Sequence, residues 1–140
     1  HGVASCSWLS SLLILAMAAT YDPDPASFKG IRLPVDHHTC ELDAERWQAW
    51  LEHDPAILAT RSEGREALRS LRGLYVDCGS RDQYHIHYGS RQLARMLKAE
   101  EIGHVYEEFD DTHSNVDYRM DRSLPFLWKA LRLGFDSLRA

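Results

Sequence analysis

The sequence lacks the features that mark several large classes of protein. Its three cysteines, Cys6, Cys40 and Cys78, are too few and too scattered for a disulfide scaffold, and no Cys-x-x-Cys pair occurs. It has no block of basic residues, and a net charge of −5 gives no support for nucleic-acid binding. No apolar run is long enough to span a bilayer. The composition, 44% hydrophobic and 26% charged, is that of a globular protein. We therefore expect a single cytoplasmic domain over residues 1–140, with reduced cysteines and no membrane partner.

The longest apolar run, residues 8–19, has two interpretations. We expect a buried strand followed by an apolar continuation. The alternative is a signal peptide, because Ala16-Met17-Ala18 resembles a cleavage site, although no Lys or Arg precedes the run. The chain begins with His1 rather than Met, so we expect a processed product or part of a longer protein.

Apolar spacing predicts two helices in the first half of the chain. One begins after Asp43, a natural N-cap, and places Trp47, Trp50 and Leu51 on one face. These tryptophans are expected in the core, with an acyl-binding pocket as the alternative. The second helix is expected over residues 57–71.

The second half is expected to alternate strands and helices. Strands are predicted at residues 74–78 and 105–109, with a helix over residues 90–101 closed by Ile102-Gly103. A last helix is expected from Ser123, with Pro125 in its first turn. Its buried residues should be Leu124, Leu127, Trp128 and Leu131. The strand–helix–strand order predicts an α/β fold with parallel strands joined by a right-handed crossover.

An acid and a histidine follow the two predicted strands. Asp82 lies a few residues past the first strand and His113 a few residues past the second. Functional groups collect beyond the carboxyl ends of parallel strands, so we expect these two side chains to meet there. A carboxylate bonded to one imidazole nitrogen fixes the tautomer, and the other nitrogen can then accept a proton from a serine. Asp82 could instead be a plain turn residue, and His113 a solvated loop residue.

Two segments, LYVDCGSRDQYHIHYGSRQLARMLKAE and HVYEEFDDTHSNVDYRMDRSLPFL, carry a family resemblance. They resemble the C-terminal part of α/β-hydrolases of the esterase D (S-formylglutathione hydrolase) and enterochelin-esterase-like family. The resemblance implies part of an α/β-hydrolase parallel sheet flanked by helices, without its N-terminal strands. It places Asp82 on the triad acid and His113 on the triad base. The segment VASCSWLSS resembles, more weakly, the strand after the nucleophile helix.

The family's nucleophile elbow, Gly-x-Ser-x-Gly, does not occur in the sequence. Ser5 and Ser7 lack flanking glycines suited to an elbow, Ser80 is too close to Asp82, and Ser90 is placed at a helix start. We therefore expect the nucleophilic serine to lie outside this chain. The expected function is that of a carboxylic-ester hydrolase acting on a small-molecule ester. The alternative is a non-catalytic remnant of the fold that acts by dimerisation or partner binding.

Other chemically active residues have simpler interpretations. His85 and His87 alternate, so an extended segment would turn both to one side, but two loop histidines are more often polar contacts than metal ligands. His37-His38-x-Cys40 fits no zinc pattern. We expect no metal and no organic cofactor. Arg119 is expected to anchor the histidine loop through a carboxylate, which the sequence does not identify.

Overall fold

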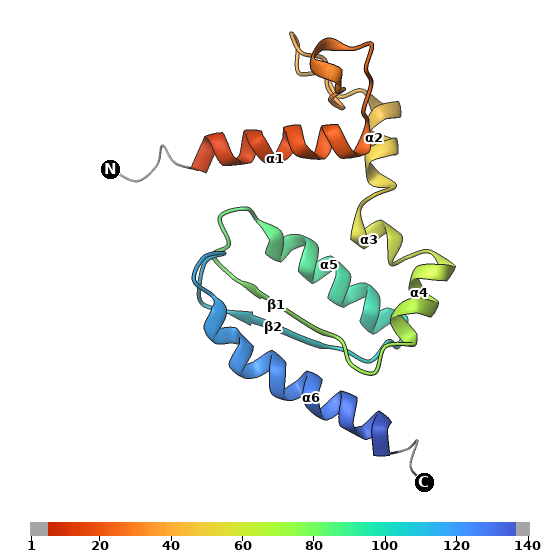
Figure 1. Cartoon of the computed structure of the whole chain (residues 1–140), viewed down its shortest axis with the longest axis vertical. Helices are drawn as coiled ribbons and strands as arrows, with labels where there is room; N and C mark the ends of the chain where they lie inside the picture. Colours follow the sequence, from red (N-terminus) through yellow and green to blue (C-terminus); the bar gives the residue numbers. More distant parts are fainter. Residues whose placement is uncertain (1–5, 137–140) are drawn as a thin grey trace. The chain divides into compact units, whose positions relative to one another are not determined.

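The computed structural model describes residues 6–136 and shows a mixed helix–strand protein (Figure 1). Its contacts group into two compact units, His1–Leu58 and Ala59–Ala140, which are described separately below. The expectation of a single domain stays a prediction. In the described part of the chain, no helix has both the length and the apolar character needed to cross a bilayer.

The first unit begins with helix α1, Cys6–Tyr21. The expected buried strand is therefore wrong. The sixteen residues contain neither Gly nor Pro and are rich in Leu and Ala, which favour helix, and they exceed the length of an ordinary strand. The helix is not buried either. Ala18 is fully buried, but the consecutive residues Leu12, Leu13, Ile14 and Leu15 are each about half exposed.

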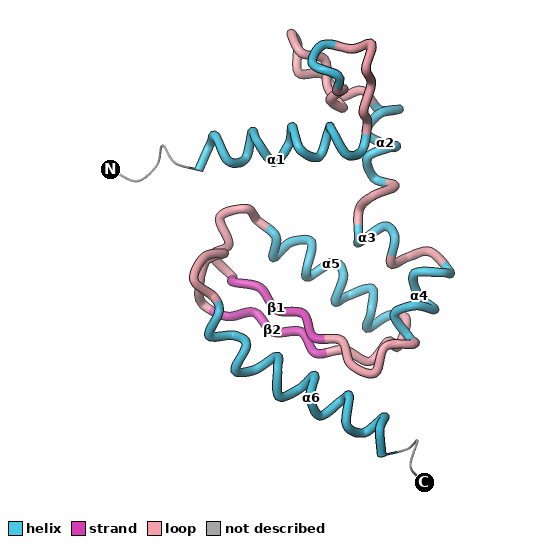
Figure 2. The backbone as a smooth tube through the Cα atoms, viewed as in Figure 1, coloured by secondary structure: helices cyan, strands magenta, loops and turns pink. Residues whose placement is uncertain are grey.

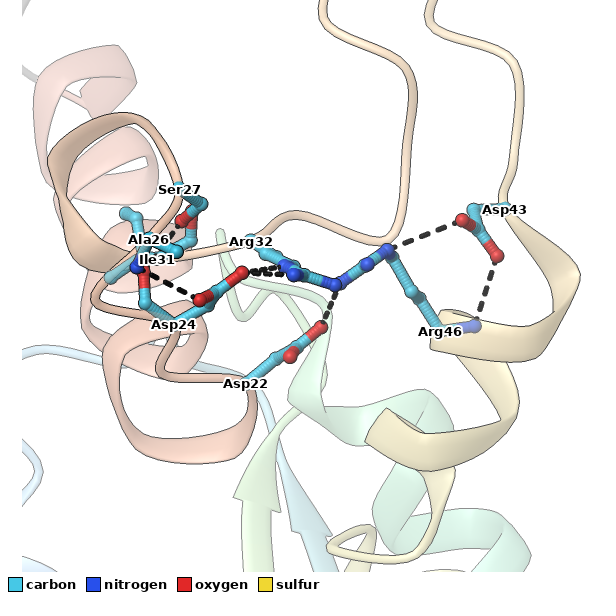
Figure 3. Close-up of polar contacts among 8 residues, drawn as sticks. All are labelled: Asp22, Asp24, Ala26, Ser27, Ile31, Arg32, Asp43 and Arg46. Carbon is cyan, nitrogen blue, oxygen red and sulfur yellow. Dashed lines mark hydrogen bonds and ion pairs between the residues drawn. The ribbon is translucent and has the colours of Figure 1, made fainter.

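The rest of this unit is a loop region followed by two short helices. A 3₁₀ helix, η1, covers Phe28–Gly30, and α2 and α3 cover Ala44–Leu51 and Pro55–Leu58. The predicted cap is confirmed, because Oδ1 of Asp43 accepts a hydrogen bond from the backbone N–H of Arg46 at 3.1 Å. The Arg46 guanidinium also pairs with Asp22 at 2.5 Å, and Arg32 pairs with Asp24 (Figure 3). The Arg46–Asp22 pair joins the loop to the start of α2, and the Arg32–Asp24 pair links two parts of the loop.

The second unit contains helix α4, Ser62–Arg69, and the predicted strand–helix–strand motif. Strand β1, Tyr75–Gly79, pairs in parallel with β2, Val105–Phe109, and helix α5, Ile86–Ala99, connects them. Tyr75 lies opposite Val105 and Gly79 opposite Phe109. Figure 1 shows α5 along one side of this two-stranded sheet and α6, Met120–Asp136, along the other. The α/β class and the parallel pairing are confirmed.

Helix α5 starts four residues earlier than expected and ends in a different cap. Leu97 is fully buried and Ala94 nearly so, which matches the predicted apolar face. At the C-terminus, the cap is formed one residue before the predicted Ile102-Gly103 pair, by Glu101 in the left-handed conformation. The N–H of Ile102 bonds to the carbonyl of Leu97 at 2.9 Å, as in a Schellman motif.

Helix α6 turns a different face inward from the one predicted. It begins at Met120, after the 3₁₀ helix η2 (Asp117–Arg119), so Pro125 lies in the second turn rather than the first. Phe126 packs against Tyr75 with ring centroids 5.6 Å apart, and Ala130 lies close to Gly73. The predicted core residues are partly or largely exposed, between 37% and 64%: Leu124, Leu127, Trp128 and Leu131. The small Ala130 side chain and the absence of one on Gly73 allow the helix to approach the backbone closely at that point.

Candidate functional site

The loops after β1 and β2 are in contact, backbone against backbone, beyond the carboxyl ends of the strands (Figure 2). The N–H of Ser80 bonds to the carbonyl of Phe109 at 2.8 Å, and that of Arg81 bonds to the carbonyl of Asp111 at 2.9 Å. A Cβ atom on Gly79 would lie 2.4 Å from the Asp111 carbonyl oxygen. Only glycine allows the two loops to lie this close, and their closeness brings the next side chains together.

Asp82 and His113 meet between these loops as predicted. Oδ2 of Asp82 lies 2.9 Å from Nδ1 of His113. The Asp82 side chain is 2% exposed, whereas that of His113 is 48% exposed. The carboxylate is therefore held inside the protein, and the imidazole it contacts faces solvent. Among residues 62–136, no side chain is hydrogen-bonded to Nε2 of His113.

Asp82 is surrounded by hydrogen-bond donors. The N–H of Tyr84 donates to Oδ1 at 2.8 Å, and Sγ of Cys78 lies 3.7 Å from Oδ2. Burial raises the pKa of Asp82, but the hydrogen bonds from His113 and from the Tyr84 N–H outweigh it, and the pKa is lowered. Asp82 is therefore a carboxylate at neutral pH. Burial, followed by the Asp82 charge, raises the pKa of the Cys78 thiol, so Cys78 is a neutral donor in the core.

The residues that follow Asp82 hold both the backbone and the ring of His113 in place. The N–H of His113 donates to Oε1 of Gln83 at 3.0 Å, and Nε2 of Gln83 lies 3.4 Å from the hydroxyl of Ser114. The Tyr84 ring lies edge-on to the imidazole, with centroids 5.0 Å apart. Residues 82–84 thus contact His113 through three consecutive side chains or backbone groups. Sequence reasoning missed Gln83 and Tyr84, because neither residue type is specific to this role.

Arg119 ties the segment after His113 to both strands. Its guanidinium lies 2.9 Å from Oδ2 of Asp77, contacts the carboxylate of Glu107 and lies 3.2 Å from the Tyr75 hydroxyl. It also lies over the Phe109 ring, 4.4 Å from the centroid. Asp77 and Glu107 face each other in the strand register, where two negative charges repel. Arg119 neutralises both and lowers the pKa of Glu107. The expected carboxylate anchor is confirmed and its partners are identified.

The remaining candidates do not converge on a metal site. The backbone of His85 has the left-handed conformation just before α5, and His87 lies inside that helix. The two histidines therefore do not share an extended segment. His87 is buried, and its Nδ1 has no partner in the described part of the protein. No group of three potential metal ligands occurs among the described residues.

Among residues 62–136, no serine hydroxyl is hydrogen-bonded to His113. Ser5 lies outside the described residues, and of Ser7 only the backbone is described. The geometry of residues 62–136 thus provides an acid and a base but no partner for the second imidazole nitrogen.

No known protein-family model matches the chain, and no curated protein sequence matches it.

Proposed function

We propose that the chain supplies the acid and base of a serine-type carboxylic-ester hydrolase, with the nucleophilic serine outside these 140 residues. One observation carries the proposal: a buried, ionised Asp82 is 2.9 Å from Nδ1 of a half-exposed His113. The carboxylate holds Nδ1 in its protonated form, which leaves Nε2 as a proton acceptor directed away from Asp82. Together with the resemblance to esterase D-like α/β-hydrolases, this supports a C-terminal portion of that fold.

In the proposed reaction, Nε2 of His113 accepts the proton of the serine hydroxyl as its oxygen attacks the ester carbonyl. Asp82 stabilises the imidazolium that forms, and backbone N–H groups stabilise the oxyanion. Collapse of the tetrahedral intermediate breaks the bond to the alcohol, which takes the proton from His113. Water, deprotonated by the same nitrogen, then releases the acid and regenerates the serine. No step requires a metal or an organic cofactor.

The test uses the full-length protein, with p-nitrophenyl acetate as substrate and a fluorophosphonate as a serine label. Asp82→Asn and His113→Gln should each lower kcat/KM by roughly 10³–10⁴-fold or more. His104→Gln is the matched control, since His104 precedes β2 at the opposite end of the strands and bonds to the Ile102 carbonyl. It should stay within about twofold of the wild-type protein, well below the 10²-fold loss expected for a catalytic group. Turnover that survives both site variants, or the absence of turnover and serine labelling, would contradict the proposal.

The second candidate is a non-catalytic role through homodimerisation. It is favoured by the outward apolar side chains of α6, among them Trp128 at 64% and Leu124 at 56% exposure. Light scattering should then show a dimer that Trp128→Glu converts to a monomer. A monomer at all concentrations would exclude this role.

A further inference from the structure

We propose that an aromatic cavity in the first unit binds a small organic cation, of the quaternary or tertiary ammonium class. The cavity has a volume of about 240 Å³. Four of its lining residues carry aromatic rings and a fifth carries a carboxylate: Tyr21, Trp47, Trp50, His53 and Asp54. Pockets for drug-sized ligands have volumes of roughly 300–1,000 Å³, so the occupant is smaller than those. The inference does not depend on the proposed hydrolase function.

The rings that line the cavity contact one another in two geometries, one perpendicular and one parallel. Tyr21 and Trp50 are nearly perpendicular, with centroids 5.6 Å apart and an interplanar angle of 84°. Tyr21 and His53 are parallel, 4.4 Å apart. The indole nitrogen of Trp50 is fully buried, so the part of Trp50 that reaches the cavity is its carbon surface. Aromatic surfaces of this kind attract a cation through the negative face of the ring, and a weakly hydrated ammonium group benefits most.

The charges favour a cation over an anion or a neutral ligand. Among the described residues, Asp54 is the one Asp, Glu, Lys or Arg that lines the cavity, and its Oδ1 accepts a hydrogen bond from the N–H of Ala56 at 2.7 Å. Residues 1–58 contain eight acidic and three basic residues, whereas residues 59–140 contain thirteen of each. The excess negative charge of the chain thus lies in the unit that holds the cavity.

The nearby arginines do not cancel this charge at the cavity. Arg46 pairs with Asp22 and Asp43, and Arg32 pairs with Asp24 (Figure 3). Both guanidiniums are therefore paired with carboxylates that do not line the cavity. Simple core packing accounts for the buried Trp50 but not for Trp47, which lines the cavity while 40% exposed.

The test is a calorimetric titration with choline and with 3,3-dimethylbutan-1-ol, its neutral isostere. The two probes have nearly the same shape, so the difference between their affinities measures the contribution of the positive charge. Choline should bind at least about tenfold more tightly, because each desolvated ring contact with a cation contributes on the order of 1 kcal/mol. Equal binding of both probes would show a purely apolar cavity and overturn the proposal, as would no binding of either.

Two variants locate the binding. Asp54→Asn removes the charge but keeps a side-chain oxygen for the Ala56 N–H, and it should weaken choline at least about threefold. Trp47→Leu removes an exposed ring and should weaken choline similarly without loss of fold. Glu45→Gln is the control, because it changes the net charge equally at an exposed site of α2 that does not line the cavity. If Glu45→Gln weakens choline binding as much as Asp54→Asn does, the attraction depends on the net charge of the protein and not on the cavity. That result would overturn the proposed site.

Discussion

Replacing Gly79 by alanine tests whether the close contact between the two loops holds the acid–base pair in place. The added methyl group would lie 2.4 Å from the carbonyl oxygen of Asp111 and 2.5 Å from that of Thr112. Both neighbours are backbone atoms, which cannot move aside as the end of a flexible side chain can. The loop that carries His113 must therefore shift away from β1.

The cost follows from the structure. Overpacking a well-packed site costs about 1–3 kcal/mol, and a backbone neighbour places this substitution at the upper end of that range. Gly79 does not have a positive φ, so the alanine itself adds no backbone strain. The expected loss of unfolding free energy is thus a steric effect, and the same displacement should separate Asp82 from His113.

Urea unfolding followed by circular dichroism measures the loss, with Gly89→Ala as the matched control. Gly89 lies in α5, and apart from its chain neighbours and the adjacent backbone of the helix no atom lies within 4 Å of the position that an alanine methyl group would take there. Alanine at this position should therefore stabilise the protein by about 0.5–1 kcal/mol. The reasoning fails if Gly79→Ala is as stable as the wild-type protein, or if both glycine substitutions change stability alike.

Two further predictions concern the charges around the site. Arg119→Gln leaves Asp77 and Glu107 facing each other, so it should lower the urea midpoint at pH 7 more than Arg81→Gln, whose partner Asp110 is 86% exposed. Because Arg119 lowers the pKa of Glu107, the difference from the wild-type protein should shrink as pH falls below about 4.3. Asp82→Asn should cost about 1.5–3 kcal/mol at pH 7, since it removes charged hydrogen bonds from a buried group. The pKa of Asp82 is lowered in the folded state, so its stabilisation is present above about pH 3.9 and is lost as pH falls through the lowered value. A pH-independent difference in either case would contradict the assignment.

The sequence predicted the strand–helix–strand motif and its acid–base pair because both depend on local patterns. Short β-prone runs ending in turns identified β1 and β2, and parallel pairing then brought the residues after them to the same edge. The sequence also predicts Arg119 as an anchor, but its partners depend on the strand register, which places Asp77 opposite Glu107. No local pattern in the sequence contains that information.

The helices that were predicted wrongly share one cause. For α1, the prediction equates an apolar run with burial, and burial of the run suggests a strand. For α6, it assigns the large apolar residues Leu124 and Trp128 to the core, whereas the inner face carries Phe126 and Ala130. Hydrophobicity predicts which residues can be buried, but the shape of the neighbouring backbone decides which face packs.

The most direct test of the acid–base pair is the imidazole ¹⁵N spectrum of His113. The structure predicts a proton on Nδ1, hydrogen-bonded to Asp82, and a bare Nε2. In Asp82→Asn the amide can donate to Nδ1, so the proton should move to Nε2, while His104, bonded to the Ile102 carbonyl, should keep its Nδ1 proton. A wild-type His113 that is protonated on Nε2, or one whose spectrum is unchanged by Asp82→Asn, would contradict the central claim.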